Sequence, residues 1–183
     1  MSFPPIIVQV LVLLIVIPAA MFDLRQRRVP NWITLPAILL GIALNGILDF
    51  RDANLRNSLL GLGLAFLIYF PLYLLRAMGA GDVKLMAAVG AIMGWANWLG
   101  IFVLTAVIGG LAAIVAVAAR GRLRKTFYNI WFILLSLLHR QAPYESNPEL
   151  DVRNVQSVRL PHAVVIALGA IGFLVVAAIW APR

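Results

Sequence analysis

Long apolar stretches recur along this chain, separated by short polar segments. Six of them approach the length of a transmembrane helix, and they cover residues 4–22, 31–48, 57–75, 83–99, 100–119 and 160–181. A hydrocarbon core of about 30 Å needs about 20 helical residues for each crossing. Because backbone N–H and C=O groups find no water in that core, spanning segments of this length must be helices. The pattern predicts an all-α polytopic membrane protein with about six transmembrane helices.

A seventh apolar stretch, residues 126–138, is too short for a comfortable crossing and begins beside a strongly basic segment. We interpret it as a short cytoplasmic helix that lies at the membrane interface. A crossing here would send Arg140, Arg153 and Arg159 to the opposite side of the membrane and invert the last helix. The interfacial interpretation keeps the basic segments together.

Basic residues cluster in the segments that this topology places on one face of the membrane: Arg25, Arg27, Arg28, Arg76, Lys84, Arg120, Arg122, Arg124 and Lys125. The segment between the second and third stretches instead balances Arg51 and Arg56 against Asp49 and Asp52. In membrane proteins the cytoplasmic loops carry the excess of Lys and Arg. We therefore expect the N-terminus outside and the basic face toward the cytoplasm.

The composition supports one membrane domain and narrows its chemistry. Of 183 residues, 63% are hydrophobic and 12% are charged, whereas soluble domains carry about 25% charged residues. The net charge of +8 is accounted for by the topology, so we expect a single integral-membrane domain over residues 1–183 and no nucleic-acid partner. The absence of cysteine excludes disulfides, thiolate zinc sites and cysteine nucleophiles, and two histidines are too few for a histidine-only metal site. We expect no metal and no cofactor.

Two acidic residues stand at the edges of apolar stretches on the expected cytoplasmic face. Asp23 follows the first stretch, and Asp82 lies in Gly79-Ala80-Gly81-Asp82, before the fourth. An ionisable group near bilayer depth costs roughly 2.5–3.5 kcal/mol on insertion scales, which makes each acid a functional candidate with the other as its partner. Two carboxylates held close together share one proton over a range of pH. Such a pair can activate water while its protonated member polarises a peptide carbonyl.

Gly79 and Gly81 remove side-chain bulk beside Asp82, so that an extended peptide can lie against the loop.

The two acids and Lys84 also admit purely structural interpretations. Asp82 can be an ordinary helix N-cap, and Asp23 a plain interfacial residue. Lys84 can be an anchor whose alkyl chain lies along apolar surface while its charge reaches the interface, or a group that adjusts the acid–base behaviour of Asp82. The residues also leave open a proton- or cation-coupled transporter, since buried acids near broken helices mark ion pathways, and a structural subunit of a secretion complex.

Three regions resemble the type IV prepilin peptidases, in that family's order, and together they cover about a sixth of the chain. The first is Asp23–Thr34, with its acid, basic run, Pro30 and Asn31. The second is the G-x-G-D motif at 79–82, followed by Val-Lys-Leu, and the third consists of 160–163 and 166–170 near the end.

The resemblance implies an intramembrane aspartyl endopeptidase that removes the short basic leader from prepilins or pilin-like proteins. It would act at the cytoplasmic face of a prokaryotic inner membrane, with the bilayer and the prepilin as partners. Asp23 and Asp82 would be the catalytic pair. The residues that would shape the loop or bind substrate are Gly79, Gly81, Lys84, Pro30 and Asn31. Larger family members also methylate the new N-terminus and carry a four-cysteine zinc site, so the resemblance is to the short type associated with tight-adherence (Flp-type) pili.

Overall fold

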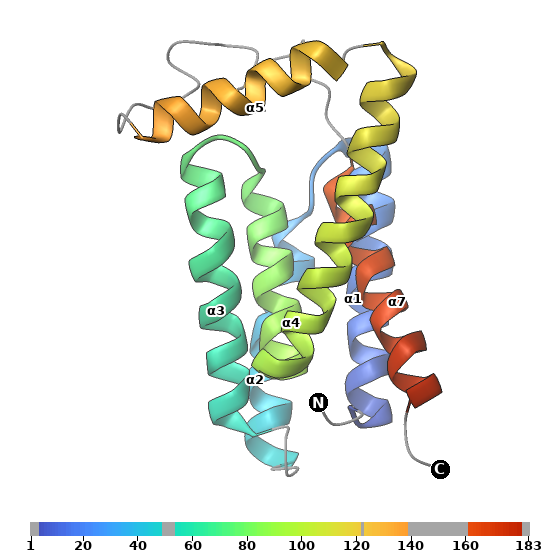
Figure 1. Ribbon diagram of the computed structural model, residues 1–183. Helices are drawn as coiled ribbons and strands as arrows, with labels where there is room; N and C mark the ends of the chain where they lie inside the picture. Colours follow the sequence, from blue (N-terminus) through green and yellow to red (C-terminus); the bar gives the residue numbers. More distant parts are fainter. Residues whose placement is uncertain (1–3, 49–53, 122, 139–160, 181–183) are drawn as a thin grey trace.

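The computed structural model describes residues 4–48, 54–121, 123–138 and 161–180, and these residues form helices and no strand. The helices are α1 (Ile6–Gln26), α2 (Asn31–Leu48), α3 (Leu55–Leu74), α4 (Ala80–Ala119), α5 (Leu123–Leu138) and α7 (His162–Trp180). Five of them run roughly along one axis, and α5 lies across one end of the bundle (Figure 1). The prediction of an all-α fold is confirmed.

The helices α1, α3, α4 and α7 are long and apolar enough to cross a membrane, and α2 is apolar but shorter. Large apolar side chains point outward along these helices, among them Leu14, Leu39 and Leu67, each at least 65% exposed. Such a surface suits contact with lipid tails rather than water. The polytopic membrane architecture is therefore confirmed for the described residues, while the count of six crossings stays a prediction.

The helix α4 reverses its direction at Gly94. This residue has φ 73° and ψ 166° inside a segment that is otherwise helical, and Figure 1 shows the first half descending beside α3 and the second half rising beside α7. Across the reversal, the indole N–H of Trp98 donates a hydrogen bond to the Met86 carbonyl at 3.2 Å. The predicted boundary between residues 99 and 100 was wrong, because the chain turns where glycine permits a positive φ.

Side chains from α2 and α3 close the end of the first half of α4. A helix that stops leaves its last carbonyls without partners. The amide nitrogen of Asn45 donates to the carbonyls of Ala91 and Ile92, at 3.0 and 3.1 Å, and the hydroxyl of Ser58 donates to that of Ala91 at 2.6 Å. Both side chains are buried. The break in α4 is thus satisfied within the protein, as the hydrocarbon region requires.

The helices α3 and α4 approach most closely where two glycines meet. A Cβ atom on Gly61 would overlap the carbonyl oxygen of Gly90, and a Cβ atom on Gly90 would overlap that of Gly61. Small residues let membrane helices pack backbone against backbone. This contact fixes how far the two antiparallel helices slide along each other, and so fixes the height of residues at the start of α4.

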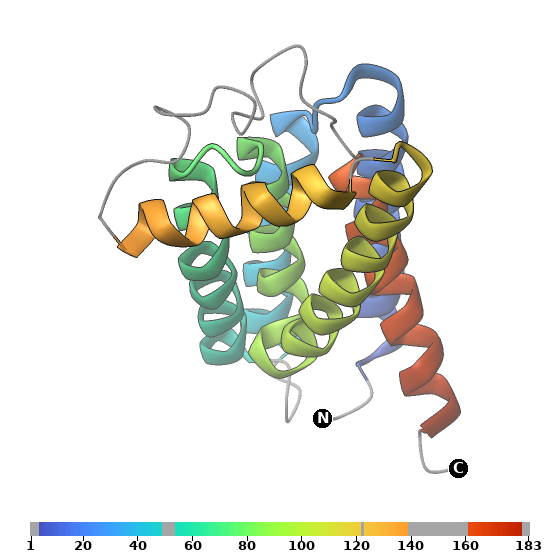
Figure 2. The ribbon, with the colours of Figure 1, turned by 45° about the horizontal axis from the view of Figure 1, so that its top comes forward.

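The amphipathic helix α5 rests across the top of the bundle and does not run among the other helices (Figures 1 and 2). Its Tyr128 and Trp131 side chains are 65% and 63% exposed. Aromatic residues of this kind favour the boundary between headgroups and acyl chains. The arrangement agrees with the prediction of an interfacial helix rather than a seventh crossing. The expected basic residues Arg140, Arg153 and Arg159 lie outside the described residues, as does the segment 49–53.

Candidate active site

Asp23 lies in the last turns of α1 and is only 7% exposed. Its Oδ2 atom accepts a hydrogen bond from the backbone N–H of Ala163, at 3.0 Å. Ala163 belongs to the first turn of α7, where backbone N–H groups have no partner within the helix. The positive end of a helix dipole favours a carboxylate at this place. Asp23 is therefore held by the N-terminus of a helix that follows it by 140 residues.

Asp82 lies in the first turn of α4 and is half-buried. It is not the N-cap, because Gly79 holds that position. The Asp82 N–H donates to the Gly79 carbonyl at 3.2 Å, and its carboxylate interacts in return with the backbone of Gly79. An acid at the third helical position that reaches back to the N-cap resembles half of a capping box. The N-cap interpretation of Asp82 was wrong by three residues, although its side chain does help to close the helix end.

The structure brings Asp23 and Asp82 together at the same end of the bundle. Their carboxylates are near enough to interact electrostatically. The two residues come from different helices, α1 and α4, and lie at the end of the bundle that α5 crosses (Figure 1). Their role as a catalytic pair stays a prediction.

A second contact joins the segment after Asp23 to the start of α4. The Nζ atom of Lys84 donates a hydrogen bond to Oδ1 of Asn31 at 3.0 Å. A Cβ atom on Gly81 would lie only 3.0 Å from Cβ of Val29, so a larger residue at 81 would push the segments apart. The bare face of Gly81 is therefore filled by Val29 and is not open to a peptide. Pro30 lies between these two contacts, and a loop-shaping role suits all of these residues better than peptide binding.

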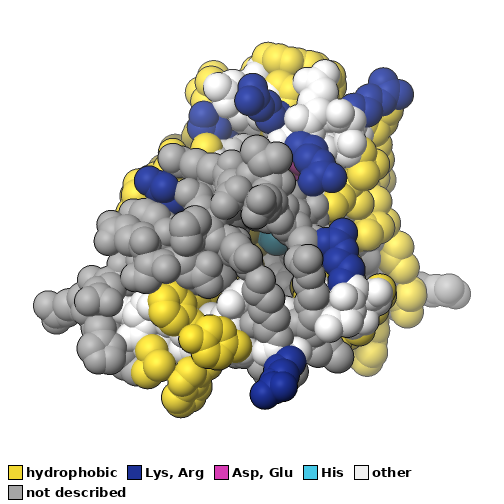
Figure 3. All heavy atoms as spheres, turned by 90° about the horizontal axis from the view of Figure 1, so that it is seen from above, with side chains coloured by type: hydrophobic (Ala, Val, Ile, Leu, Met, Phe, Trp, Pro, Cys, Tyr) yellow, Lys and Arg dark blue, Asp and Glu magenta, His cyan; other side chains and the backbone are white. Residues whose placement is uncertain are grey.

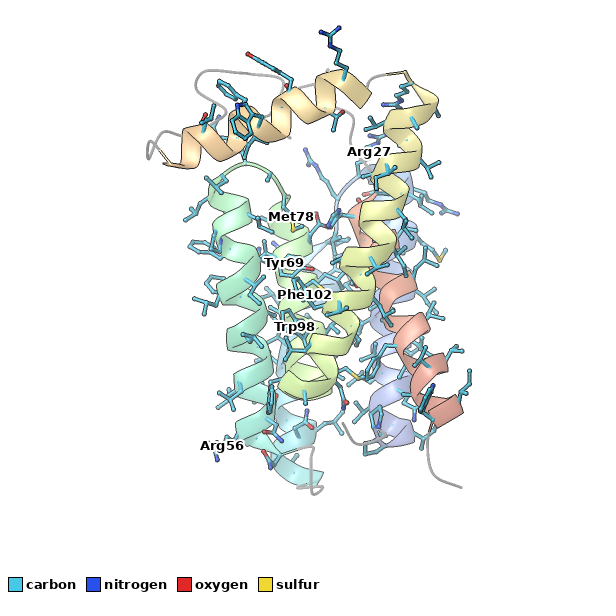
Figure 4. The ribbon with its side chains drawn as sticks, viewed as in Figure 1. Arg27, Arg56, Tyr69, Met78, Trp98 and Phe102 are labelled. Carbon is cyan, nitrogen blue, oxygen red and sulfur yellow. The ribbon has the colours of Figure 1, made fainter. Side chains whose placement is uncertain are left out.

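Three further residues near the two acids were not singled out from the sequence as site residues. His162 and Arg27 interact electrostatically with Asp23, and Tyr69 interacts with Asp82. Figure 4 labels Arg27 near the top of the bundle and Tyr69 deeper inside it. His162 lies within the stretch 160–163 that carried part of the resemblance, whereas Tyr69 is one of many aromatic residues in an apolar stretch. Only the packing of α3 on α4 could reveal it.

A sequence profile described as the type IV leader peptidase family matches residues 10–114, which is more than half of the chain and includes both acids. The chain belongs to this family. Relatives named "Prepilin leader peptidase/N-methyltransferase" are similar to it. The one from Escherichia coli (strain K12) is 32% identical over 147 residues, 75% of this chain and 64% of the relative.

Two further relatives with the same name cover this leader peptidase family member less fully. The relative from Myxococcus xanthus is 33% identical over 59% of this chain and 34% of its own length. The relative from Neisseria gonorrhoeae is 38% identical over 55% of this chain and 37% of its own length. The chain thus spans less than two thirds of the relatives it matches. No solved structure matches it.

Positive charge surrounds the two acids of this leader peptidase family member. Seen from above, Lys and Arg side chains form a rim around the top of the bundle (Figure 3). The rim consists of basic residues at the ends of α1, α3 and α4 and the start of α5: Arg25, Arg27, Arg28, Arg76, Lys84, Arg120 and Arg124. Within the described ranges, no three His, Cys, Asp or Glu side chains come together as a metal site would require.

Proposed function

We propose that this chain is an intramembrane aspartyl endopeptidase that cleaves the short basic leader from prepilins or pilin-like proteins. The observation that carries the proposal is the meeting of Asp23 and Asp82 at one end of a membrane bundle, with their carboxylates in electrostatic contact. Family membership supports the same activity. Lone acids with structural roles would have no reason to converge from two helices onto one point.

The reaction uses both carboxyl groups. The ionised carboxylate takes a proton from a water molecule, the water oxygen bonds to the scissile carbonyl carbon, and the protonated partner gives its proton to the carbonyl oxygen. As the tetrahedral intermediate collapses, the C–N bond breaks and the leaving amine takes the proton from the first carboxyl group. The second group recovers a proton from the intermediate's hydroxyl. Both groups end in their starting states, and no cofactor is needed.

We propose that the protein lies in a prokaryotic inner membrane, with the two acids on its cytoplasmic side and the N-terminus outside. The rim of Lys and Arg on the acid-bearing end supports this orientation, because cytoplasmic loops carry the excess of basic residues. The helix α5 lies on the same end, where its exposed aromatic side chains suit the headgroup region.

We further propose the Flp type of substrate and cleavage without methylation. Only residues 27–30 separate α1 from α2, which leaves no space there for an inserted zinc domain. The sequence also contains no cysteine from which such a four-cysteine zinc site could be built. We propose that residues 1–183 form a single integral-membrane peptidase domain.

Co-expression with an Flp-type prepilin tests the proposal directly. The wild-type chain should convert the prepilin to a shorter product, and Asp23→Asn and Asp82→Asn should each abolish the conversion. Asp52→Asn, which makes the same change in the segment between α2 and α3, should cleave as wild type. Undiminished cleavage by either site variant would exclude the two-carboxylate mechanism. Ion flux into sealed vesicles without any cleaved product would favour the transporter instead.

A further inference from the structure

The packing of α3 against the first half of α4 sets a register between the two helices. Gly61 meets Gly90 in direct backbone contact. A second contact joins Asn57, four residues before Gly61 in α3, to Gly94, four residues after Gly90 in α4. A Cβ atom added to Gly94 would lie 3.4 Å from the Cβ atom of Asn57. Each step along one helix is thus matched by an equal step backward along the other. The register is that of two antiparallel helices in continuous contact.

The same register places Tyr69 level with Asp82. Tyr69 lies eight residues beyond Gly61, and Asp82 lies eight residues before Gly90. Both residues lie toward the interface of the two helices, since Tyr69 is only 3% exposed. The electrostatic interaction of the Tyr69 hydroxyl with the Asp82 carboxylate agrees with this placement.

Aromatic neighbours fix the direction of the Tyr69 ring. Its centroid lies 6.4 Å from that of Trp98 and 6.0 Å from that of Phe102, both in edge-on geometry with interplanar angles of 74° and 79°. Trp98 and Phe102 are themselves stacked, at 5.4 Å and 14°. Figure 4 shows the three rings inside the bundle, below the end where the acids lie. Such contacts hold an aromatic ring in one orientation.

The Tyr69 ring is buried, but its hydroxyl is not one of the fully buried polar atoms that lack a hydrogen-bond partner. In the part of the chain that the structure describes, those atoms are Asn97 Oδ1 and Thr105 Oγ1. The hydroxyl lies on the side of the ring that interacts with Asp82. It can therefore donate a hydrogen bond to a group that enters beside that acid.

We propose that the Tyr69 hydroxyl is a third catalytic group, which donates a hydrogen bond to the scissile carbonyl oxygen as the tetrahedral intermediate forms. The inference rests on the proposed peptidase function. No atom is transferred by Tyr69. The two carboxyl groups move the protons, and the phenol stabilises the charge that develops on the oxygen. Fixed donors aimed at such charge act strongly in a site that excludes water.

The substitution Tyr69→Phe removes the hydroxyl and leaves the ring contacts with Trp98 and Phe102 in place. Loss of one oxyanion donor typically lowers kcat about 100-fold, so we expect a fall of this size with KM and Tm unchanged. Tyr73→Phe removes a hydroxyl one turn later on α3 and should retain wild-type kcat. Both variants are assayed as full chains in detergent against the same prepilin.

A second measurement separates catalysis from packing. A statine-containing peptide mimics the tetrahedral intermediate, and Tyr69→Phe should weaken its binding by the same factor as kcat, while the affinity for an uncleaved substrate peptide stays constant. Wild-type kcat in Tyr69→Phe would overturn the assignment, and so would a loss of kcat accompanied by an equal effect in Tyr73→Phe or by a lower Tm. A wild-type chain that cleaves no prepilin would instead overturn the peptidase function itself.

Discussion

The hydrogen bond from Ala163 to Asp23 can be removed without changing any side chain. Replacing residue 163 by lactic acid, the α-hydroxy analogue of alanine, converts the backbone amide to an ester, which deletes the N–H donor and weakens the His162 carbonyl as an acceptor. The donor belongs to the first turn of α7, so no hydrogen bond within the helix depends on it. Because Ala163 is fully buried and Asp23 is 7% exposed, water cannot readily replace the lost donor.

The size of the effect follows from the geometry. The N···O distance of 3.0 Å is that of an ordinary hydrogen bond to a carboxylate, and hydrogen bonds to charged groups contribute about 1.5–3 kcal/mol. Since 1.36 kcal/mol corresponds to a factor of ten in rate, we expect kcat to fall about 10- to 150-fold if the bond orients Asp23 for the reaction. KM should stay within about twofold, because Ala163 N–H contacts the acid and not the peptide.

The assay is steady-state cleavage of an Flp-type prepilin by the purified full chain, with Tm measured in parallel. The matched control replaces Val164 by α-hydroxyisovaleric acid. This ester removes the neighbouring N–H, which donates to the Pro161 carbonyl at 3.2 Å and not to Asp23. The control should retain kcat. Equal kcat in the two ester variants would refute the reasoning that the amide at 163 positions the catalytic carboxylate.

Three further predictions test the scaffold around the site. Gly61→Val should lower the free energy of unfolding by at least 1–3 kcal/mol, because the added atoms collide with the backbone of α4; Gly63→Val, which meets nothing within 4 Å, should not, and equal Tm values would contradict the packing. Asn45→Leu should cost about 1–3 kcal/mol in chemical denaturation, because buried carbonyls at the break in α4 lose their donor; an unchanged midpoint would show that Ser58 suffices. Lys84→Met and Asn31→Leu, singly and together, should each lower the free energy of unfolding by less than about 1 kcal/mol, since their hydrogen bond is exposed. A coupling energy above that value between the two substitutions would show a more rigid contact.

The sequence predicted the features that depend on segment length and local charge. Helices follow from the apolar stretches because the backbone of a spanning segment must satisfy its own hydrogen bonds in the bilayer. The helix α5 was distinguished because its apolar stretch is short and follows a strongly basic segment. Asp23 and Asp82 were identified because acids are costly in such a chain. Each of these inferences needed only the residues beside the feature.

Other features depend on how the helices fit together, and so they could not be read from the sequence. The stretch from 83 to 119 is mostly apolar, with Lys84, Asn97 and Thr105 as its polar residues, and length alone put its division near residue 99. The turn lies at Gly94 because Asn45 and Ser58, from two other helices, satisfy the carbonyls that it frees. The hydrogen-bond donor to Asp23 is a backbone N–H group, which every residue except proline possesses. Tyr69 gains its place only through the register of α3 on α4.

The short first half of α4 has a consequence for where a substrate bond can be cut. At 1.5 Å per residue, the segment Ala80–Met93 is only about 21 Å long, and its residues from Leu85 to Gly94 are buried on every side. Neighbouring helices therefore separate this stretch from the surrounding lipid. Under the proposed function, a substrate helix does not reach Asp82 across Leu85–Gly94 and approaches it from the end of the bundle where α4 begins. Its backbone is then unwound beside the two acids, where each released amide needs a new hydrogen-bond partner or costs several kcal/mol.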